Sequence, residues 1–116
     1  MSDRELLELA AKAAGITGGW GEVHALPQGE VDCTDLWFLE SDDQPYVWNP
    51  LTDDGDAFRL ACSLRLDMAF LEGFEQIIVD DYHGSNRAEE DYQPDMAAAA
   101  RRAVVRAAAE IGRTMK

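Results

Sequence analysis

The sequence has few of the residues that metal sites, nucleic-acid interfaces and membrane spans require. Its 116 residues include two cysteines, two histidines and ten Lys and Arg residues, against 23 Asp and Glu residues. The spacing of Cys33 and Cys62 matches no zinc site, so we expect no metal, no cofactor and two reduced thiols. No apolar run reaches the ~18 residues of a membrane span, and residues 1–5 lack a signal-peptide core. These absences predict a cytoplasmic protein.

The acidic residues are concentrated in the middle of the chain, whose formal net charge is -13. Residues 15–93 carry eighteen acidic and three basic groups, whereas residues 94–116 carry two acidic and five basic groups. Because nucleic-acid phosphates and anionic lipids bind clustered Lys and Arg, we expect no direct binding to nucleic acid or membranes. The excess of negative charge favours solubility and a basic protein partner.

The hydrophobic pattern predicts five structural units in a single domain that covers residues 1–116. Apolar residues at three- and four-residue steps predict helices, and short apolar runs between turn residues predict β-hairpins. The expected order is helix 3–14, hairpin 36–39 with 46–48, helix 53–65, hairpin 68–71 with 76–79, and helix 95–113. Residues 15–35 are expected to be mostly loop with room for a short edge strand near Trp20, Gly73 to supply a turn, and residues 80–93 to form an exposed, mobile loop.

These units fit a layered fold. The strand runs are continuous in apolar residues, as in Leu36–Leu39, and such strands are usually covered on both faces. The pattern therefore favours an α/β (α+β) class: a small helix–sheet–helix sandwich with a mostly antiparallel sheet and the order helix–hairpin–helix–hairpin–helix. On the last helix, Arg106 and Glu110 are expected to pair on the exposed side. The expected core faces of the helices are Leu6, Leu7, Leu9, Ala10 and Ala13, then Ala57, Leu60, Ala61 and Leu64, then Ala97, Ala100, Val104, Ala107, Ala108 and Ile111.

Residues 48–60 form a junction between a strand and a helix. Pro50 cannot donate a ladder hydrogen bond and ends the strand that contains Trp48. Thr52 or Asp53 then caps the helix, and the acidic residues that follow interact with the positive end of its dipole. A calcium loop starting at Asp53 would need a glycine in sixth and a glutamate in twelfth position, and the twelfth residue is leucine. We therefore expect a capped helix start with a structural role.

The junction also carries a resemblance to a known family. The run Trp48–Ala61, with its tryptophan, proline and acidic cluster, resembles the sequence shared by the phage ABA sandwich domain proteins. The run Ala98–Ala108 is similar to the last helix of that family, so the resemblance covers roughly residues 35–113. It implies helix–sheet–helix layering and a bacteriophage or prophage source, and it implies no catalytic residues. The segment Gly18–Asp35 does not match the family pattern.

Catalytic and metal-binding patterns are sparse. The run from Asp80 to His83 could offer carboxylates and an imidazole to a metal or to acid–base chemistry, and His24 is the only other histidine. A metal site needs three or four converging ligands, so a solvated loop is the simpler interpretation. HExxH, Walker A, GxSxG and GxGxxG motifs are absent from the sequence. We expect Cys62, Trp37 and Trp48 to lie in the core.

Three hypotheses about function follow. The first is a small acidic phage or prophage accessory protein that acts by binding a host or phage protein. The second is an acidic mimic of nucleic acid that occupies a host DNA-binding protein, and the third is a small enzyme that uses residues 80–83. The sequence does not specify the oligomeric state. The expected partner surface consists of Trp20, His24, Asp80, Asp81, Tyr82, His83, Glu89, Glu90 and Asp91.

Overall fold

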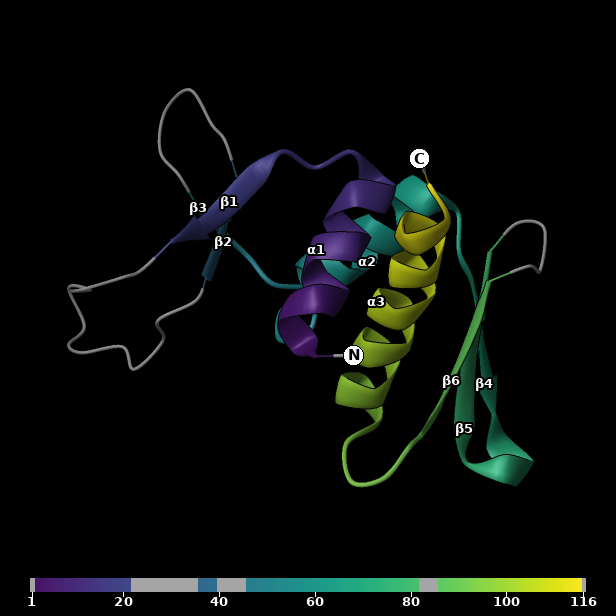
Figure 1. Ribbon diagram of the computed structural model, residues 1–116. Coiled ribbons are helices and arrows are strands. Elements are labelled where there is room, and N and C mark those ends of the chain that lie inside the picture. Colours follow the sequence, from purple (N-terminus) through teal and green to yellow (C-terminus); the bar gives the residue numbers. More distant parts are fainter. Residues whose placement is uncertain (1, 22–35, 40–45, 82–85, 116) are drawn as a thin grey trace, which may run out of the picture.

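The computed structural model describes residues 2–21, 36–39, 46–81 and 86–115, and combines helices with antiparallel strands (Figure 1). In chain order the elements are α1 (Asp3–Ala14), β1 (Gly18–Gly21), β2 (Leu36–Leu39), β3 (Tyr46–Trp48), α2 (Asp54–Leu64), β4 (Asp67–Leu71), the short 3-10 helix η1 (Glu72–Phe74), β5 (Gln76–Asp80), β6 (Arg87–Asp91) and α3 (Met96–Thr114). This mixed α+β class and the order of helices and strands confirm the predicted fold class.

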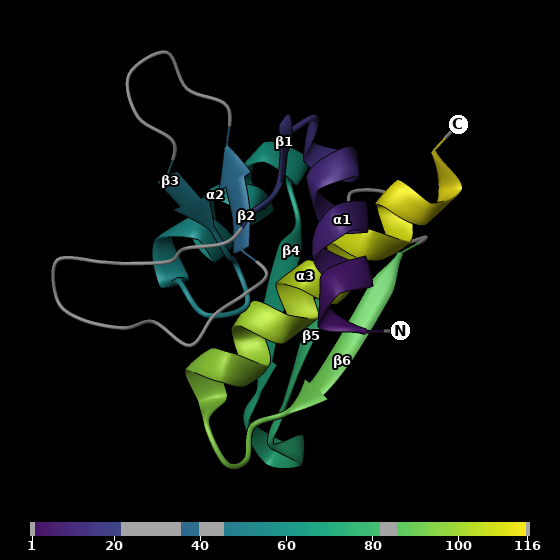
Figure 2. The same cartoon turned by 60° about the vertical axis from the view of Figure 1, so that its left-hand side comes forward.

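The strands of the described residues form two three-stranded antiparallel sheets, β1-β2-β3 and β4-β5-β6. The helices lie together between the two sheets, and α3 lies between α1 and the second sheet (Figures 1 and 2). The second sheet therefore packs one face on α3, and the continuous apolar run of β5 is not covered equally on both faces. Ile77 and Val79 are fully buried, whereas Ile78 between them is only partly buried. This alternation is typical of an antiparallel sheet with one face on the core.

The exposed, mobile loop expected at residues 80–93 is wrong for residues 87–91, and residues 82–85 lie outside the described part of the chain. Strand β6 occupies Arg87–Asp91 and pairs with β5 along its whole length. Four of its five residues are charged, and Asp and Glu have low β-propensity, so the sequence does not indicate a strand here. The strand forms because Ala88 is buried under α3 and the carboxylate of Glu90 bonds to arginines of that helix.

Side chains cap the helix starts as the sequence indicates. Ser2 Oγ accepts a hydrogen bond from the amide of Glu5, and Gly15 ends α1 with φ 68°. Of the two candidates for the α2 cap, Asp53 holds the role: its carboxylate accepts from the Asp56 amide at 2.8 Å. The β4–β5 turn differs from the expectation, since its left-handed residue is Glu75 with φ 51°, while Gly73 lies inside η1.

The core lies where the three helices meet one another and the β4-β5-β6 sheet. Trp48 is 4% exposed and belongs to this core, as predicted. Cys62 is exposed instead of buried, because it lies beside the apolar face of α2 and not on it. The side chains of Trp20 and Trp37, and all of Cys33, lie outside the described residues.

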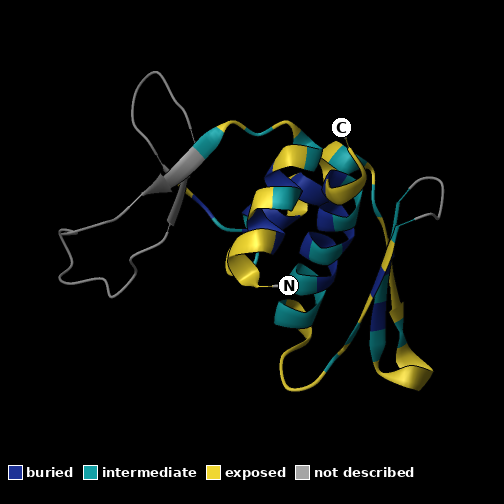
Figure 3. Cartoon of the chain, in the orientation of Figure 1, coloured by how far each residue is buried: buried dark blue, intermediate teal, exposed yellow. Residues whose placement is uncertain are grey.

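Helix α3 approaches α1 through small residues. At Gly112 a Cβ atom would stand 2.0 Å from the carbonyl oxygen of Leu9, so only glycine fits this crossing. Ala107 and Ala108 are fully buried in the same half of the helix. Burial falls toward the start of α3, where Met96 and Ala97 are exposed (Figure 3).

A candidate binding groove between α2, α3 and β4

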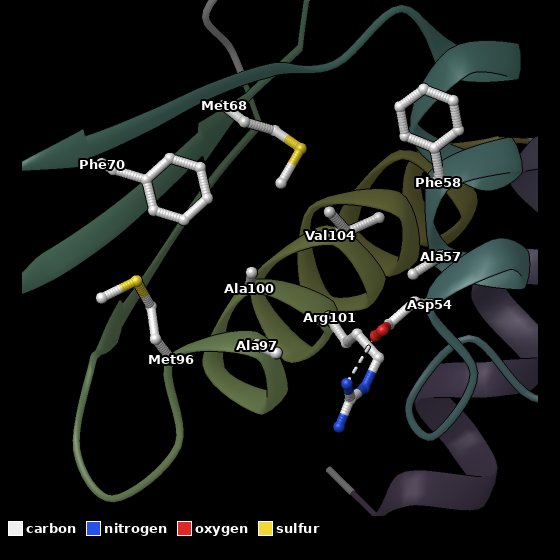
Figure 4. Close-up of a pocket in the computed structure, with 10 residues that line it drawn as sticks. All are labelled: Asp54, Ala57, Phe58, Met68, Phe70, Met96, Ala97, Ala100, Arg101 and Val104. Carbon is white, nitrogen blue, oxygen red and sulfur yellow. Dashed lines mark hydrogen bonds and ion pairs between the residues drawn. The ribbon is translucent and has the colours of Figure 1, made fainter.

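An open apolar groove lies where β4 and α2 diverge above the first half of α3 (Figure 4). Its volume is about 470 Å³, within the range of small-molecule and cofactor sites. Most of the surface that lines it is apolar. Two methionines and two phenylalanines, from β4, α2 and α3, contribute the largest side chains. The lining residues are Asp54, Ala57, Phe58, Met68, Phe70, Met96, Ala97, Ala100, Arg101 and Val104.

The strand register explains why β4 points its large side chains into the groove. Met68 pairs with Val79 and Phe70 pairs with Ile77, so all four side chains project from the sheet face that packs on α3. On β5 these positions are covered by the helix, and Val79 and Ile77 have no exposed surface. On β4, the side chains of Met68 and Phe70 extend beyond the part of the sheet that α3 covers, and Phe70 is 52% exposed. Figure 4 shows both side chains turned toward α3.

Helix α2 supplies the second wall. Its buried face packs through Ala57, Leu60 and Ala61, while Phe58, one position further round, is 70% exposed at the mouth of the groove. The floor comes from α3, where Ala97 and Ala100 leave open space between the walls. Isolated exposed apolar residues are ordinary, but a contiguous set around a hollow marks an interaction surface.

One end of the groove is closed by an ion pair between its helices. Arg101 Nη1 lies 2.6 Å from Asp54 Oδ1, and Arg101 Nε donates to the Leu51 carbonyl at 2.9 Å. These bonds fix the start of α2 against α3. Inside the junction, the buried Asp56 carboxylate accepts from the Asn49 amide at 2.9 Å. The acidic cluster of the junction thus holds the groove wall in place.

A second hollow, of about 590 Å³, lies on the α1 side of α3 and is polar. Arg106 lies 2.8 Å and Arg102 3.4 Å from the Glu90 carboxylate. The expected pair between Arg106 and Glu110 is not what forms, since Glu110 lies 2.7 Å from Arg113. The two bonds to Glu90 hold β6 against α3, which is a structural role.

Five acidic residues of the expected partner surface lie in the described part of the chain, and they are spread over the second sheet. Glu90 is turned inward, and Glu89 lies 3.2 Å from Arg87. Two of the residues lie at one end of the sheet: Asp80, which is 3.8 Å from Arg87, and Asp81, which accepts a hydrogen bond from Asn86 at 2.7 Å. Asp91 lies at the other end and accepts a hydrogen bond from Gln76. Trp20 falls on β1 with an undescribed side chain, and His24, Tyr82 and His83 lie outside the described residues.

The groove could have been suspected from two signals in the sequence. Phe58 lies off the apolar face predicted for its helix, and Met68 and Phe70 alternate at strand spacing. All three are large apolar side chains, and Phe58 lies on the side of its helix that is expected to be exposed. What the sequence could not give is the divergence of β4 from α2, which opens the space between them.

Metal ligands do not converge in the part of the chain that the structure describes: no group of three or more His, Cys, Asp or Glu residues is placed to hold an ion. Both histidines fall outside that part, so the absence of a metal stays a prediction. Within the same described residues, no helix is both long enough and apolar enough to cross a bilayer.

Comparison of this chain with family models, curated proteins and solved structures found no match. The resemblance of residues 35–113 to the phage ABA sandwich domain proteins therefore stays an expectation. The arguments for function come from the geometry of the groove.

Proposed function

We propose that this chain acts by binding another protein, and that an apolar segment of the partner enters the groove between α2, α3 and β4. One observation carries the proposal. Phe58, Met68 and Phe70 surround a common hollow that the described residues leave open, whereas alanines and valines a few residues away are completely buried. Burial of such side chains is worth about 25 cal/mol for each Å² removed from water, so the open groove favours an apolar occupant.

The chemistry of the groove suits a peptide segment. Two of its side chains are methionines, which are flexible and adapt to irregular apolar partners. The groove is framed by two helices and a strand, and the Asp54–Arg101 ion pair holds the helices in place. A preformed groove of this kind binds without a large cost of ordering the protein.

The setting that we propose follows the resemblance stated above. The partner would be a phage or host protein in the cytoplasm of an infected or lysogenic cell. The net charge of -13 favours a partner that is basic around its apolar contact.

The two other hypotheses have less support. A nucleic-acid mimic needs unpaired carboxylates in rows at phosphate spacing, yet Asp54 and Glu90 are bonded to arginines of α3. An enzyme centred on residues 80–83 cannot be argued from geometry, because residues 82–85 lie outside the described chain. Both stay predictions from the sequence.

A selection from random twelve-residue peptides displayed on yeast tests the proposal. Peptides selected on the wild-type chain should bind the Phe58→Ser variant at least about 10-fold more weakly, a loss of ~1.4 kcal/mol. The matched control is Phe74→Ser, because Phe74 is exposed to a similar extent but lies outside the groove. The control should bind like the wild type. If no selected peptide distinguishes the two variants, the groove is not the binding site.

A further inference from the structure

The two edges of the β4-β5-β6 sheet differ in a way that points to how the partner binds. In the described residues β4 and β6 are the outer strands, and each pairs with β5 alone. Edge strands carry unpaired backbone N–H and C=O groups, and proteins usually protect them with charged side chains or proline. Strand β6 is protected in this way, since four of its five residues, Arg87–Asp91, are charged. Strand β4, Asp67–Leu71, has four apolar residues, no lysine and no proline.

Burial across the sheet shows that the β4 edge is incomplete. In one row of paired residues, exposure runs from 39% at Met68 to 0% at Val79 and 3% at Ala88. The protected edge is therefore buried against α3, and the apolar edge is not. A further strand beside β4, about 4.8 Å away, would continue this row over the open half of α3. The groove is the space into which its inward side chains would project.

We propose that an extended segment of the partner adds to β4 as a fourth strand, with apolar side chains at every second position in the groove and basic residues at its ends. This inference rests on the proposed function and specifies its mode. Main-chain hydrogen bonds to the free edge of β4 would supply affinity, and the groove would select the alternate side chains. Met68 and Phe70, two residues apart, have the spacing that such a strand presents.

Charge determines which kind of strand fits. Asp67 starts β4, and Glu72 and Glu75 follow it in the turn, against a single basic neighbour, Arg65. In antiparallel pairing of two copies of this chain, Asp67 of each copy would approach the acidic turn of the other. Like charges opposite each other across a strand pair are destabilising, and both copies carry a charge of -13. A foreign strand with Lys or Arg at its ends meets no such repulsion.

The spacing of residues in the selected peptides is the first test. Strand addition predicts apolar residues at alternate positions, flanked by Lys or Arg, in peptides that distinguish Phe58→Ser from Phe74→Ser. Groove-dependent peptides with apolar residues at three- and four-residue steps would instead mean a bound helix. That result would overturn strand addition and leave the proposed function standing, whereas the absence of any groove-dependent peptide would overturn both.

Backbone methylation is the second test, and it needs no variant of the protein. One selected peptide is made in two forms, N-methylated at its odd or at its even residues, and titrated by calorimetry. Alternate amides of a strand face opposite edges, so one form should lose at least about 10-fold in affinity while the other binds like the parent. Equal binding by both forms, or equal loss, would overturn strand addition.

Self-association is the third test. Sedimentation of the wild-type chain should show a monomer at micromolar concentration with and without peptide. A dimer that the peptide dissociates would show that a second copy occupies the β4 edge and would overturn the proposal of a foreign strand.

Discussion

The two halves of α3 both contain four alanines, but their surroundings differ. Residues 103–112 are mostly buried between α1 and the sheet, and at Gly112 the two helices touch through their backbones. Residues 96–101, which also include four alanines, contain no buried residue (Figure 3). In the closed half, small side chains let a neighbouring helix approach. In the open half, the same side chains form the floor of a groove that no described part of the chain fills.

This difference shows that the alanine pattern of a helix predicts close approach without saying what approaches. For residues 103–112 the neighbour is α1, whose own alanines, Ala10 and Ala11, are buried in the contact. For residues 96–101 the neighbours are the diverging β4 and α2, which leave a gap of about 470 Å³. Adding or removing side-chain volume should therefore change the free energy of unfolding more in the closed half than in the open half.

Removal of an aromatic ring should separate the closed core from the groove most strongly. Trp48→Ala should destabilise by about 3–5 kcal/mol, because the ring is 4% exposed and belongs to the core that α3 closes. Phe58→Ala, at the mouth of the groove, should change the free energy of unfolding by only ~0.5 kcal/mol. Urea denaturation measures both, and a large loss for Phe58→Ala would mean that the groove is closed.

The helix crossing should tolerate no added atom. Gly112→Ala should destabilise by about 3 kcal/mol, because its Cβ would meet the Leu9 carbonyl and force α1 away from α3. Elsewhere in a helix the same change is favourable by about 1 kcal/mol, so the sign itself is informative. Gly73→Ala, where an added Cβ meets nothing within 4 Å, is the control and should be neutral or slightly stabilising. A stable Gly112→Ala variant would contradict the crossing.

A pair of identical substitutions compares the two halves directly. Ala107→Leu should overpack the closed half and cost about 1–3 kcal/mol, since Ala107 has no exposed surface. Ala97→Leu adds the same volume to the exposed floor of the groove and should cost less than ~0.5 kcal/mol, because Leu is also a good helix former. Equal losses in thermal melting would remove the distinction between the halves.

The smallest expected effect concerns the wall of the groove. Asp53→Ala removes the α2 cap, whose carboxylate accepts from the Asp56 amide, and should cost about 1 kcal/mol. Thr52→Ala should cost less, because the Thr52 hydroxyl makes only a 3.5 Å contact with the Asn49 carbonyl. The reverse order of the two melting temperatures would assign the cap to Thr52.

The sequence predicts most elements because their periods are strong and their ends carry specific residues. The Ser2 and Asp53 caps and the helix-ending Gly15 are local signals, and they place α1 and α2 within a residue or so of their observed bounds. Strand β6 has no such local signals, because its stability depends on the contact of Glu90 with Arg102 and Arg106 of a later helix. Tertiary contacts of that kind leave no periodic trace in the sequence.

The candidate site was harder to predict than the fold for a related reason. Among the acidic residues at 80–91 that were expected to face a partner, Glu90 bonds to Arg102 and Arg106 of α3, and Asp80 and Glu89 lie beside Arg87. The groove, by contrast, is made of ordinary core residue types. Met68 and Phe70 differ from Val79 and Ile77 only by lying on the edge strand, and the sheet order decides that.

Carbon-13 NMR of methionine methyl groups tests the central claim most directly. Met68 and Met96 line the groove, whereas Met115 is similarly exposed at the far end of α3 and provides an internal control. During titration with a peptide selected on the wild-type chain, the Met68 and Met96 methyl resonances should shift to saturation while Met115 stays in place. Saturation binding with Met68 and Met96 unmoved would contradict the assignment of the groove as the partner site.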